Sequence, residues 1–219
     1  MEKIIFLILV FFEIAFSIQA QYMPRNQYLN GNIFEDITDG SGFYHQGHGK
    51  CTSLADYDLD GDLDIYISVV FGENRLFRNE SNMHFRDLTT TLRLNCKYDT
   101  HGIVWADFNN DGFLDLLVAG ESQEKDGRGI NLFYNDGKGN FKNVSELLPS
   151  EVKSGKQITV FDYNDDGDLD VLIAGINGGI SLLRNDGGNN NHFITMKLVG
   201  LKAGSAKNNY FGIGAKVEM

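Results

Sequence analysis

The stretch Asp56-Tyr-Asp-Leu-Asp-Gly-Asp-Leu-Asp64 decides how this chain is interpreted, because it occurs three times. Its other copies are Asp107-Phe-Asn-Asn-Asp-Gly-Phe-Leu-Asp115 and Asp162-Tyr-Asn-Asp-Asp-Gly-Asp-Leu-Asp170, which align with it without gaps. The first aspartates of successive copies lie 51 and 55 residues apart. A period of this length is typical of repeat proteins, in which each unit is one supersecondary structure that packs against its neighbours.

Short apolar segments follow each copy, at residues 65–70, 116–119 and 171–174. They are rich in β-branched residues and are apolar throughout, which predicts strands covered on both faces. Two further elements keep the same period. One is Asn74-Arg-Leu-Phe-Arg-Asn, Asn131-Leu-Phe-Tyr-Asn and Ser181-Leu-Leu-Arg-Asn; the other is Phe34-Glu-Asp-Ile-Thr, Phe85-Arg-Asp-Leu-Thr and Phe141-Lys-Asn-Val-Ser, with Phe193 where a fourth copy would begin.

Units of about fifty residues with roughly four strands predict an all-β fold built of propeller blades. The chain holds three such periods and a leading outer strand at residues 34–38. Closed propellers have roughly four to eight blades. We therefore expect a partial β-propeller of about three blades, which is a fragment of a larger ring.

Each nine-residue loop has oxygen-bearing side chains at positions one, three, five and nine and a glycine at position six. With the carbonyl of position seven and a water, these side chains would supply the six or seven oxygen ligands that Ca²⁺ takes. No loop contains Cys or His, which disfavours zinc and copper, and position twelve lacks the glutamate of an EF-hand. The alternative, ordinary polar turns, fits poorly with three copies in register. We predict about three Ca²⁺ ions, with these ligands: Asp56, Asp58, Asp60, Asp62 and Asp64; Asp107, Asn109, Asp111, Phe113 and Asp115; Asp162, Asn164, Asp166, Asp168 and Asp170.

These loops and the two accompanying elements resemble FG-GAP/VCBS repeats, the calcium-loop blades also found in integrin α-subunit propellers. The tail contains Asn191-His-Phe-Ile-Thr-Met-Lys-Leu-Val-Gly and Gly212-Ile-Gly-Ala-Lys-Val-Glu, and it resembles the opening of an ASPIC/UnbV domain. The combination is similar to the cartilage acidic protein group. This resemblance implies blades over residues 21–190, an incomplete ASPIC/UnbV domain over residues 191–219, and a complete propeller of about seven blades.

Residues 1–20 have the layout of a secretory signal peptide, with Lys3, an apolar run and a cleavage site after Ala20 or, alternatively, after Ser17. We expect a secreted, extracellular protein, or a cell-envelope protein in a bacterium, without membrane insertion after cleavage. In an oxidising compartment Cys51 and Cys96 are expected to form a disulfide, the alternative being two separate buried thiols. In a eukaryote, the sequons at Asn79 and Asn143 are predicted glycosylation sites.

The net charge of −11 argues against nucleic acid as a partner. Since the sequence has no nucleophile elbow and no Walker loop, we expect a non-catalytic protein. We predict a calcium-binding extracellular binding or adhesion module for a protein or glycan ligand. The alternatives are the non-catalytic part of a larger secreted enzyme or polysaccharide-handling protein, and a structural spacer. The aromatic residues beside the loops are expected to pack between blades, or to form a carbohydrate platform: Tyr57, Trp105, Phe108 and Tyr163.

Overall fold

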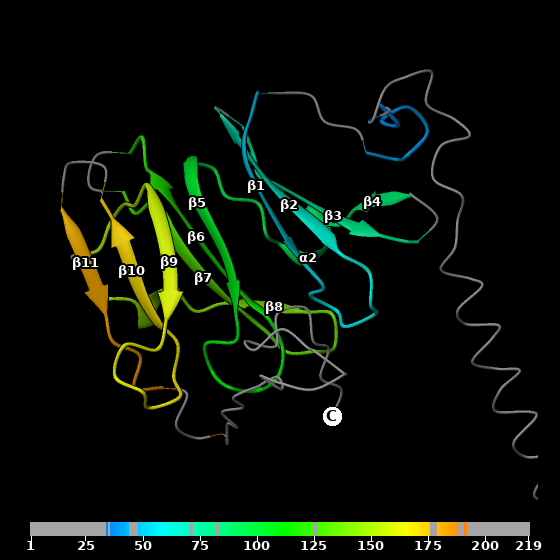
Figure 1. Cartoon of the computed structure of the whole chain (residues 1–219). Helices are drawn as coiled ribbons and strands as arrows, with labels where there is room; N and C mark the ends of the chain where they lie inside the picture. Colours follow the sequence, from blue (N-terminus) through cyan, green and yellow to red (C-terminus); the bar gives the residue numbers. More distant parts are fainter. Residues whose placement is uncertain are drawn as a thin grey trace, which may run out of the picture. The chain divides into compact units, whose positions relative to one another are not determined.

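Three antiparallel sheets make up the described part of the chain, one for each sequence repeat (Figure 1). A computed structural model describes residues 34, 36–43, 48–70, 72–81, 84–124, 127–175, 179–187 and 191. The chain divides into two units, Met1–Asp39 and Gly40–Met219, and all three sheets belong to the second unit. The predicted signal peptide and residues 192–219 of the predicted ASPIC/UnbV segment lie outside the described residues.

Each sheet is a meander in which strands consecutive in sequence are neighbours. The first sheet contains β1 (His48–Ala55), β2 (Asp64–Val70), β3 (Arg75–Asn79) and β4 (Phe85–Asp87). The second contains β5 (Asp99–Ala106), β6 (Asp115–Glu121), β7 (Ile130–Asn135) and β8 (Phe141–Asn143). The third contains β9 (Gln157–Phe161), β10 (Asp170–Ala174) and β11 (Ile180–Leu183). The predicted all-β class with three blade-like units is confirmed, and the only helical elements of the described residues are α2 (Thr89–Leu92) and the 3-10 turn η1 (Ser145–Leu147).

The second sheet is covered on both faces, as its continuous apolar strand predicts. Side chains alternate across a strand, so Leu116 and Val118 of β6 join the core shared with the first sheet, whereas Leu117 and Ala119 join the core shared with the third. All four are fully buried. Burial of about 1.5–3 kcal/mol for each large apolar side chain makes this packing the main source of stability. A single blade therefore depends on its neighbours.

The Phe-x-Asp/Asn-x-Thr/Ser element forms the fourth strand of the first two sheets and a turn that follows it. The carboxylate Oδ1 of Asp87 accepts hydrogen bonds from the N–H and the hydroxyl of Thr89 at 2.9 and 2.6 Å. The hydroxyl oxygen of Thr89 then accepts the N–H of Leu76 in β3 at 2.8 Å. Asn143 and Ser145 repeat this arrangement against β7.

The leading strand predicted at residues 34–38 is not formed, because residues 34 and 36–38 have no strand conformation. A strand needs a partner edge to satisfy its backbone groups. Phe34 and Ile37 are instead exposed, at 88% and 50%. Asp36 nevertheless makes the same turn with Thr38, at 3.0 and 2.6 Å to its N–H and hydroxyl.

Candidate metal sites in the aspartate loops

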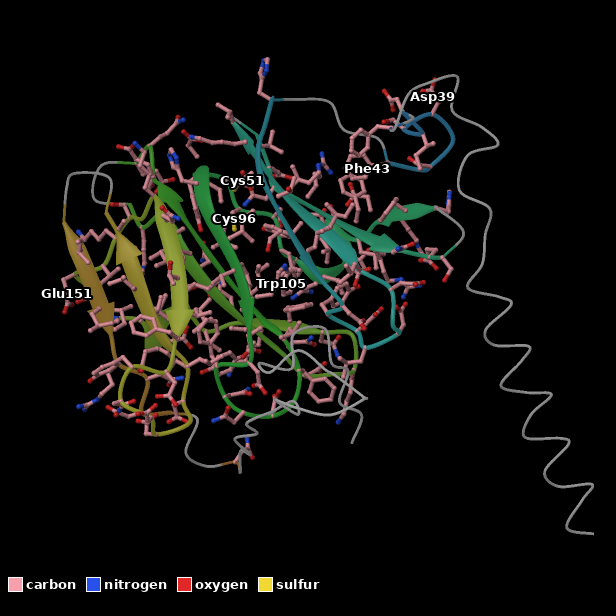
Figure 2. The ribbon with its side chains drawn as sticks, in the orientation of Figure 1. Asp39, Phe43, Cys51, Cys96, Trp105 and Glu151 are labelled. Carbon is pink, nitrogen blue, oxygen red and sulfur yellow. The ribbon has the colours of Figure 1, made fainter. Side chains whose placement is uncertain are left out.

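Each aspartate loop connects the first strand of a sheet to its second strand. The loops therefore follow β1, β5 and β9 and precede β2, β6 and β10, and all three lie at the same end of their sheets (Figure 1). Figure 2 shows oxygen-bearing side chains gathered in the loop between β9 and β10. The three blades thus present three equivalent acidic loops at one end.

The backbone of the loops is the same in all three copies. Position four has a positive φ in each, at Leu59 (58°), Asn110 (54°) and Asp165 (59°), and so has the glycine at position six, with φ of 94°, 90° and 88°. A Cβ on Gly61, Gly112 or Gly167 would meet no atom within 4 Å. The glycine is therefore required by the backbone conformation and not by lack of space.

The position-one aspartate stabilises the turn by accepting backbone hydrogen bonds within the loop. Its Oδ2 accepts the N–H of the position-six glycine at 3.0 Å for Asp56, 2.8 Å for Asp107 and 2.8 Å for Asp162. The position-five aspartate accepts the N–H of position seven, at 3.0, 2.9 and 2.9 Å in the three loops. In the second and third loops Oδ1 of Asp107 and of Asp162 also accepts the position-five N–H, at 3.0 and 3.2 Å. These hydrogen bonds turn the carboxylates toward the loop interior.

The ninth-position aspartates are buried and anchored by two backbone N–H groups each. Asp115 is fully buried and accepts the N–H of Phe108 at 3.0 Å and of Asn135 at 2.8 Å. Asp64 and Asp170 have the equivalent pairs of donors. The pKa of Asp64 and of Asp115 is raised to about 7, mainly by burial and in smaller part by the other loop carboxylates, against the opposing effect of these hydrogen bonds. A negative charge at this position therefore needs a compensating positive charge.

Two carboxylate oxygens of the first loop have no hydrogen-bond donor among the described residues. Asp56 Oδ1 and Asp58 Oδ1 are buried and accept no hydrogen bond. With Asp64, these residues form a group whose possible ligand atoms all lie within 4.8 Å of one another. Burial, and then the neighbouring Asp60, raise the pKa of Asp58. An all-oxygen group with orphaned buried acceptors is the chemistry that a hard cation such as Ca²⁺ fits.

The second and third loops have an asparagine at position three, and its amide contacts the position-five carboxylate. Asn109 Nδ2 donates to Asp111 at 3.0 Å, and Asn164 Nδ2 donates to Asp166 at 2.7 Å. The second and third loops thus bring together positions one, three and five, and the first loop has the one group of three acidic side chains found within 4.8 Å among the described residues. Asp168, predicted to act through its carbonyl, uses its side chain to accept from Asn110 of the preceding loop at 2.8 Å. The ligand assignments themselves stay predictions.

One set of functional residues was missed by the sequence reasoning: the asparagine at the end of the third strand in the first two sheets, and two residues after β11 in the third. Asn135 Nδ2 donates to the carbonyl of Leu114 in its own loop at 3.2 Å and to that of Tyr57 in the preceding loop at 2.8 Å. Asn185 makes the same two contacts with Leu169 and Phe108. The recurrence of this asparagine in the sequence was the available signal. It braces adjacent aspartate loops against each other.

The predicted disulfide between Cys51 and Cys96 is wrong, since both residues are free thiols. Cys51 Sγ lies 3.1 Å from the hydroxyl of Ser68, and Cys96 Sγ lies 3.9 Å from the hydroxyl of Tyr66. Each sulfur therefore has its own polar neighbour, and Cys96 is buried. The two cysteines are therefore separate side chains, as the alternative prediction stated. Burial raises the pKa of Cys96 to about 11, which makes this thiol unreactive at neutral pH.

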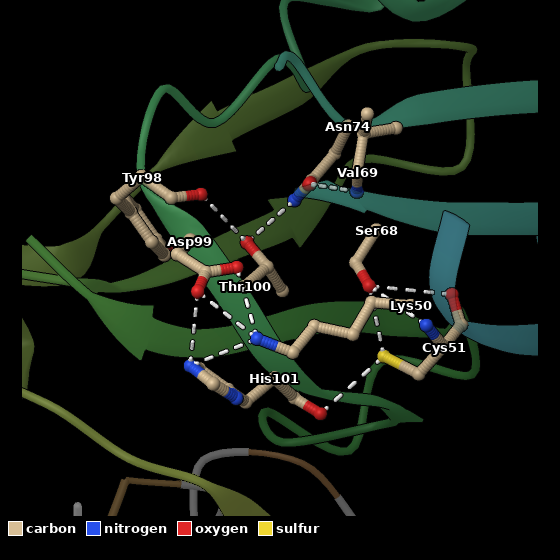
Figure 3. A network of polar contacts seen from close by, with 9 residues as sticks. All are labelled: Lys50, Cys51, Ser68, Val69, Asn74, Tyr98, Asp99, Thr100 and His101. Carbon is tan, nitrogen blue, oxygen red and sulfur yellow. Dashed lines mark hydrogen bonds and ion pairs between the residues drawn. The ribbon is translucent and has the colours of Figure 1, made fainter. Parts of the chain in front are cut away.

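A polar network at the other end of the first two sheets contains Lys50, Cys51, Asp99 and His101 (Figure 3). Lys50 Nζ contacts both carboxylate oxygens of Asp99 at 3.0 Å and the His101 ring at 3.2 Å. The Cys51 thiol donates to the backbone carbonyl of His101 and not to its imidazole. The cysteine thus lacks the base that a nucleophile requires. This network connects β1 with β5.

The aromatic residues beside the loops mostly pack between sheets, as predicted. Tyr57 and Phe108 are buried, and the Tyr57 ring stacks on Trp105 at 6.0 Å and lies 5.7 Å from Phe141. Tyr163, next to the open face of the third sheet, is 45% exposed.

The two predicted glycosylation sites differ in their surroundings. Asn79 occupies the bracing position of the first sheet, where its Nδ2 donates to the carbonyl of Leu63 at 3.3 Å. Asn143 is exposed and uses only its Oδ1, which accepts from Ser145. Modification of either residue stays a prediction, and Asn143 is the more accessible.

Comparison with known proteins gives two similarities. The model of the FG-GAP-like repeat family matches residues 56–118 and 115–173. Cartilage acidic protein 1 of Xenopus tropicalis is 27% identical over 152 residues, which cover 64% of this chain and 23% of that protein. The predicted ASPIC/UnbV segment lies beyond these repeats and stays a prediction. Among the described residues, no helix is both long enough and apolar enough to span a membrane.

Proposed function

Because the chain belongs to the FG-GAP-like repeat family, we propose that it is an extracellular repeat module that binds one Ca²⁺ ion in each aspartate loop. The observation that carries this proposal is the pair of buried acceptors without a donor, Asp56 Oδ1 and Asp58 Oδ1, beside the buried Asp64. Carboxylates this close repel each other strongly unless a cation or a proton lies between them. A divalent ion would meet that need in each of the three loops.

The ligands in this proposal are the side chains of positions one, three, five and nine and the carbonyl of position seven. When bound, the ion would neutralise the facing carboxylates and hold the two ends of the loop together. The chain prepares the site in advance, since the positive φ at positions four and six and the anchored ninth aspartate are already in place. Because adjacent loops are braced by Asn135 and Asn185, ions in the loops would also stiffen the contacts between blades.

The partner in this proposal is an extracellular protein or glycan that the chain binds without catalysis. Support comes from the repeat family and from the similarity to cartilage acidic protein 1, both of which favour a non-catalytic extracellular module. Rigid blades that present loops at one end suit recognition, because preorganised loops lose little entropy on binding. Three bound Ca²⁺ ions would also offset six of the eleven net negative charges.

Calcium uptake by the folded chain tests the metal part of the proposal. Native mass spectrometry and titration calorimetry should count about three Ca²⁺ ions in the wild type and one fewer in Asp58→Ala. The matched control is Asp136→Ala, which removes an exposed aspartate from the β7–β8 hairpin and should leave the count unchanged. A folded protein that takes up no Ca²⁺ would refute the proposal.

Partner binding is tested separately with an array of glycans and matrix proteins, probed in calcium and in chelator. We expect binding to a member of the array that disappears in chelator. Binding that is equally strong without calcium, or no binding to any member, would contradict the proposed adhesion role.

A further inference from the structure

The third sheet ends in an uncovered strand. β11 is its outermost strand, and no strand of the described residues pairs with the free edge of β11. In the other sheets β4 and β8 cover the equivalent strands. On the face toward the second sheet Leu183 is only half-buried, whereas Phe77 and Phe133, its counterparts in the other two sheets, are 1% and 4% exposed. A cavity of about 360 Å³ adjoins this edge, with Phe108, Leu132 and Leu182 in its lining.

Residues 34–38 have the sequence of a fourth strand, but the described residues 34 and 36–38 have no strand conformation. They align with the strands of β4 and β8 and the turns that follow. The turn between Asp36 and Thr38 already has the hydrogen bonds found at Asp87 and Asn143. Ile37 is 50% exposed, whereas the equivalent Leu88 and Val144 are 8% and 4% exposed. The segment therefore has the sequence and the turn of a fourth strand without the strand conformation at its described residues.

We propose that residues 34–38 of a second copy of this chain pair with β11 and complete the third sheet. The register follows from the other sheets, where Phe77 faces Asp87 and Phe133 faces Asn143, and it places Asp36 opposite Leu183. The N–H of Ile37 then donates to the carbonyl of Leu182, as Leu88 does to Leu76 at 3.0 Å and Val144 does to Leu132 at 2.8 Å.

The charges of the two edges support this pairing. The residue between Phe34 and Asp36 in sequence is Glu35, where β4 and β8 have the basic residues Arg86 and Lys142. In the proposed register its cross-strand neighbour is Arg184, whereas Arg86 faces Arg78 and Lys142 faces Tyr134. Opposite charges facing each other across strands are favourable, and like charges are not. Of the three copies of this sequence element, residues 34–38 thus have the charge that best matches β11.

The segment cannot reach β11 of its own chain. The carbonyl of Ser41 accepts the N–H of Phe85 at 2.6 Å, which holds residue 41 at the outer margin of the first sheet. Two residues separate Thr38 from Ser41, and a chain of that length spans roughly 10 Å. β5 packs against both β1 and β9, so the second sheet lies between the first and the third (Figure 1). If each copy donates residues 34–38 to the third sheet of the other, the dimer contains six sheets. That number is within the range of roughly four to eight blades in closed propellers.

The competing occupant is the tail of the same chain at Phe193. It matches the element less well, since Thr195 replaces the Asp or Asn and Lys197 replaces the Thr or Ser. The side chains that form the turn and bond to the third strand are therefore missing from the tail sequence. We accordingly assign the edge to residues 34–38.

Sedimentation of the secreted full-length chain in calcium tests the assignment. Ile37→Pro removes the donating N–H, and proline is compatible with a segment that is in no sheet. We expect a dimer for the wild type and at least ten-fold weaker self-association for Ile37→Pro. The matched control is Lys138→Glu, which changes an exposed residue of the β7–β8 hairpin in the second sheet and should leave the dimer intact.

A labelled peptide of residues 31–40 provides an independent measurement. It should bind to the Ile37→Pro protein, whose β11 edge is free, and the same peptide with proline at position 37 should bind at least ten-fold more weakly. The proposal is overturned by a monomeric wild type, by self-association that is insensitive to Ile37→Pro or is lost in Lys138→Glu, or by a peptide that does not bind. The last result would mean that the tail occupies the edge.

Discussion

Asn135 offers a direct measure of how strongly the aspartate loops are braced. Its side chain is 2% exposed and donates to the carbonyls of Tyr57 and Leu114 at 2.8 and 3.2 Å. Asn135→Ala deletes both hydrogen bonds and leaves buried carbonyls without these donors, at about 1–3 kcal/mol for each unsatisfied group. We expect a loss of about 3 kcal/mol in the free energy of unfolding. In a domain of this size Tm falls by roughly 2–4 °C for each kcal/mol of lost stability, so we expect Tm to fall by about 6–12 °C.

The equivalent residues in the other sheets provide matched controls. Asn185 donates the same two bonds at the more exposed third sheet, whereas the Nδ2 of Asn79 donates one long bond of 3.3 Å to Leu63. The Oδ1 of each asparagine accepts one backbone N–H, so that bond is common to all three. Urea denaturation in calcium, on protein from a host without N-glycosylation, should rank the losses as Asn135→Ala, then Asn185→Ala, then Asn79→Ala, the last below about 1 kcal/mol. Equal losses at all three positions, or none at Asn135, would show that the bracing contacts carry no stability.

Three further predictions concern the loops and the thiols. Without calcium, Asp64 and Asp115 have pKa values of about 7, above the value in the unfolded chain. Their contribution to stability is therefore full below about pH 4 and is lost as the pH rises through 7. In chelator, the urea midpoint should be higher at pH 5.5 than at pH 8, and the reverse order would contradict this prediction. Gly112→Ala should lower the free energy of unfolding by about 1–2 kcal/mol because φ there is 90°, and an unchanged denaturation curve would refute it. Thiol titration of the denatured, unreduced chain should detect both cysteines, whereas detection of no free thiol would show that Cys51 and Cys96 form a disulfide.

The sequence by itself determined the repeat, the β-class and the position of each acidic loop. These depend on local spacing, since a glycine at position six and oxygen side chains at alternate positions constrain one short loop. The apolar run of β6 likewise predicted a strand covered on both faces, because no other environment suits it.

Only the tertiary structure decided the features that depend on which side chain arrives from a neighbouring sheet. Spacing cannot reveal that Asn135 reaches the carbonyl of Tyr57, 78 residues away in sequence. Nor can it reveal that Cys51 and Cys96 have separate hydroxyl neighbours, although cysteine content and compartment favour a bond. Residues 34–38 have the sequence of β4 and β8, but the described residues 34 and 36–38 form no strand, because a strand is completed by the edge it pairs with, and that edge lies outside its own sequence.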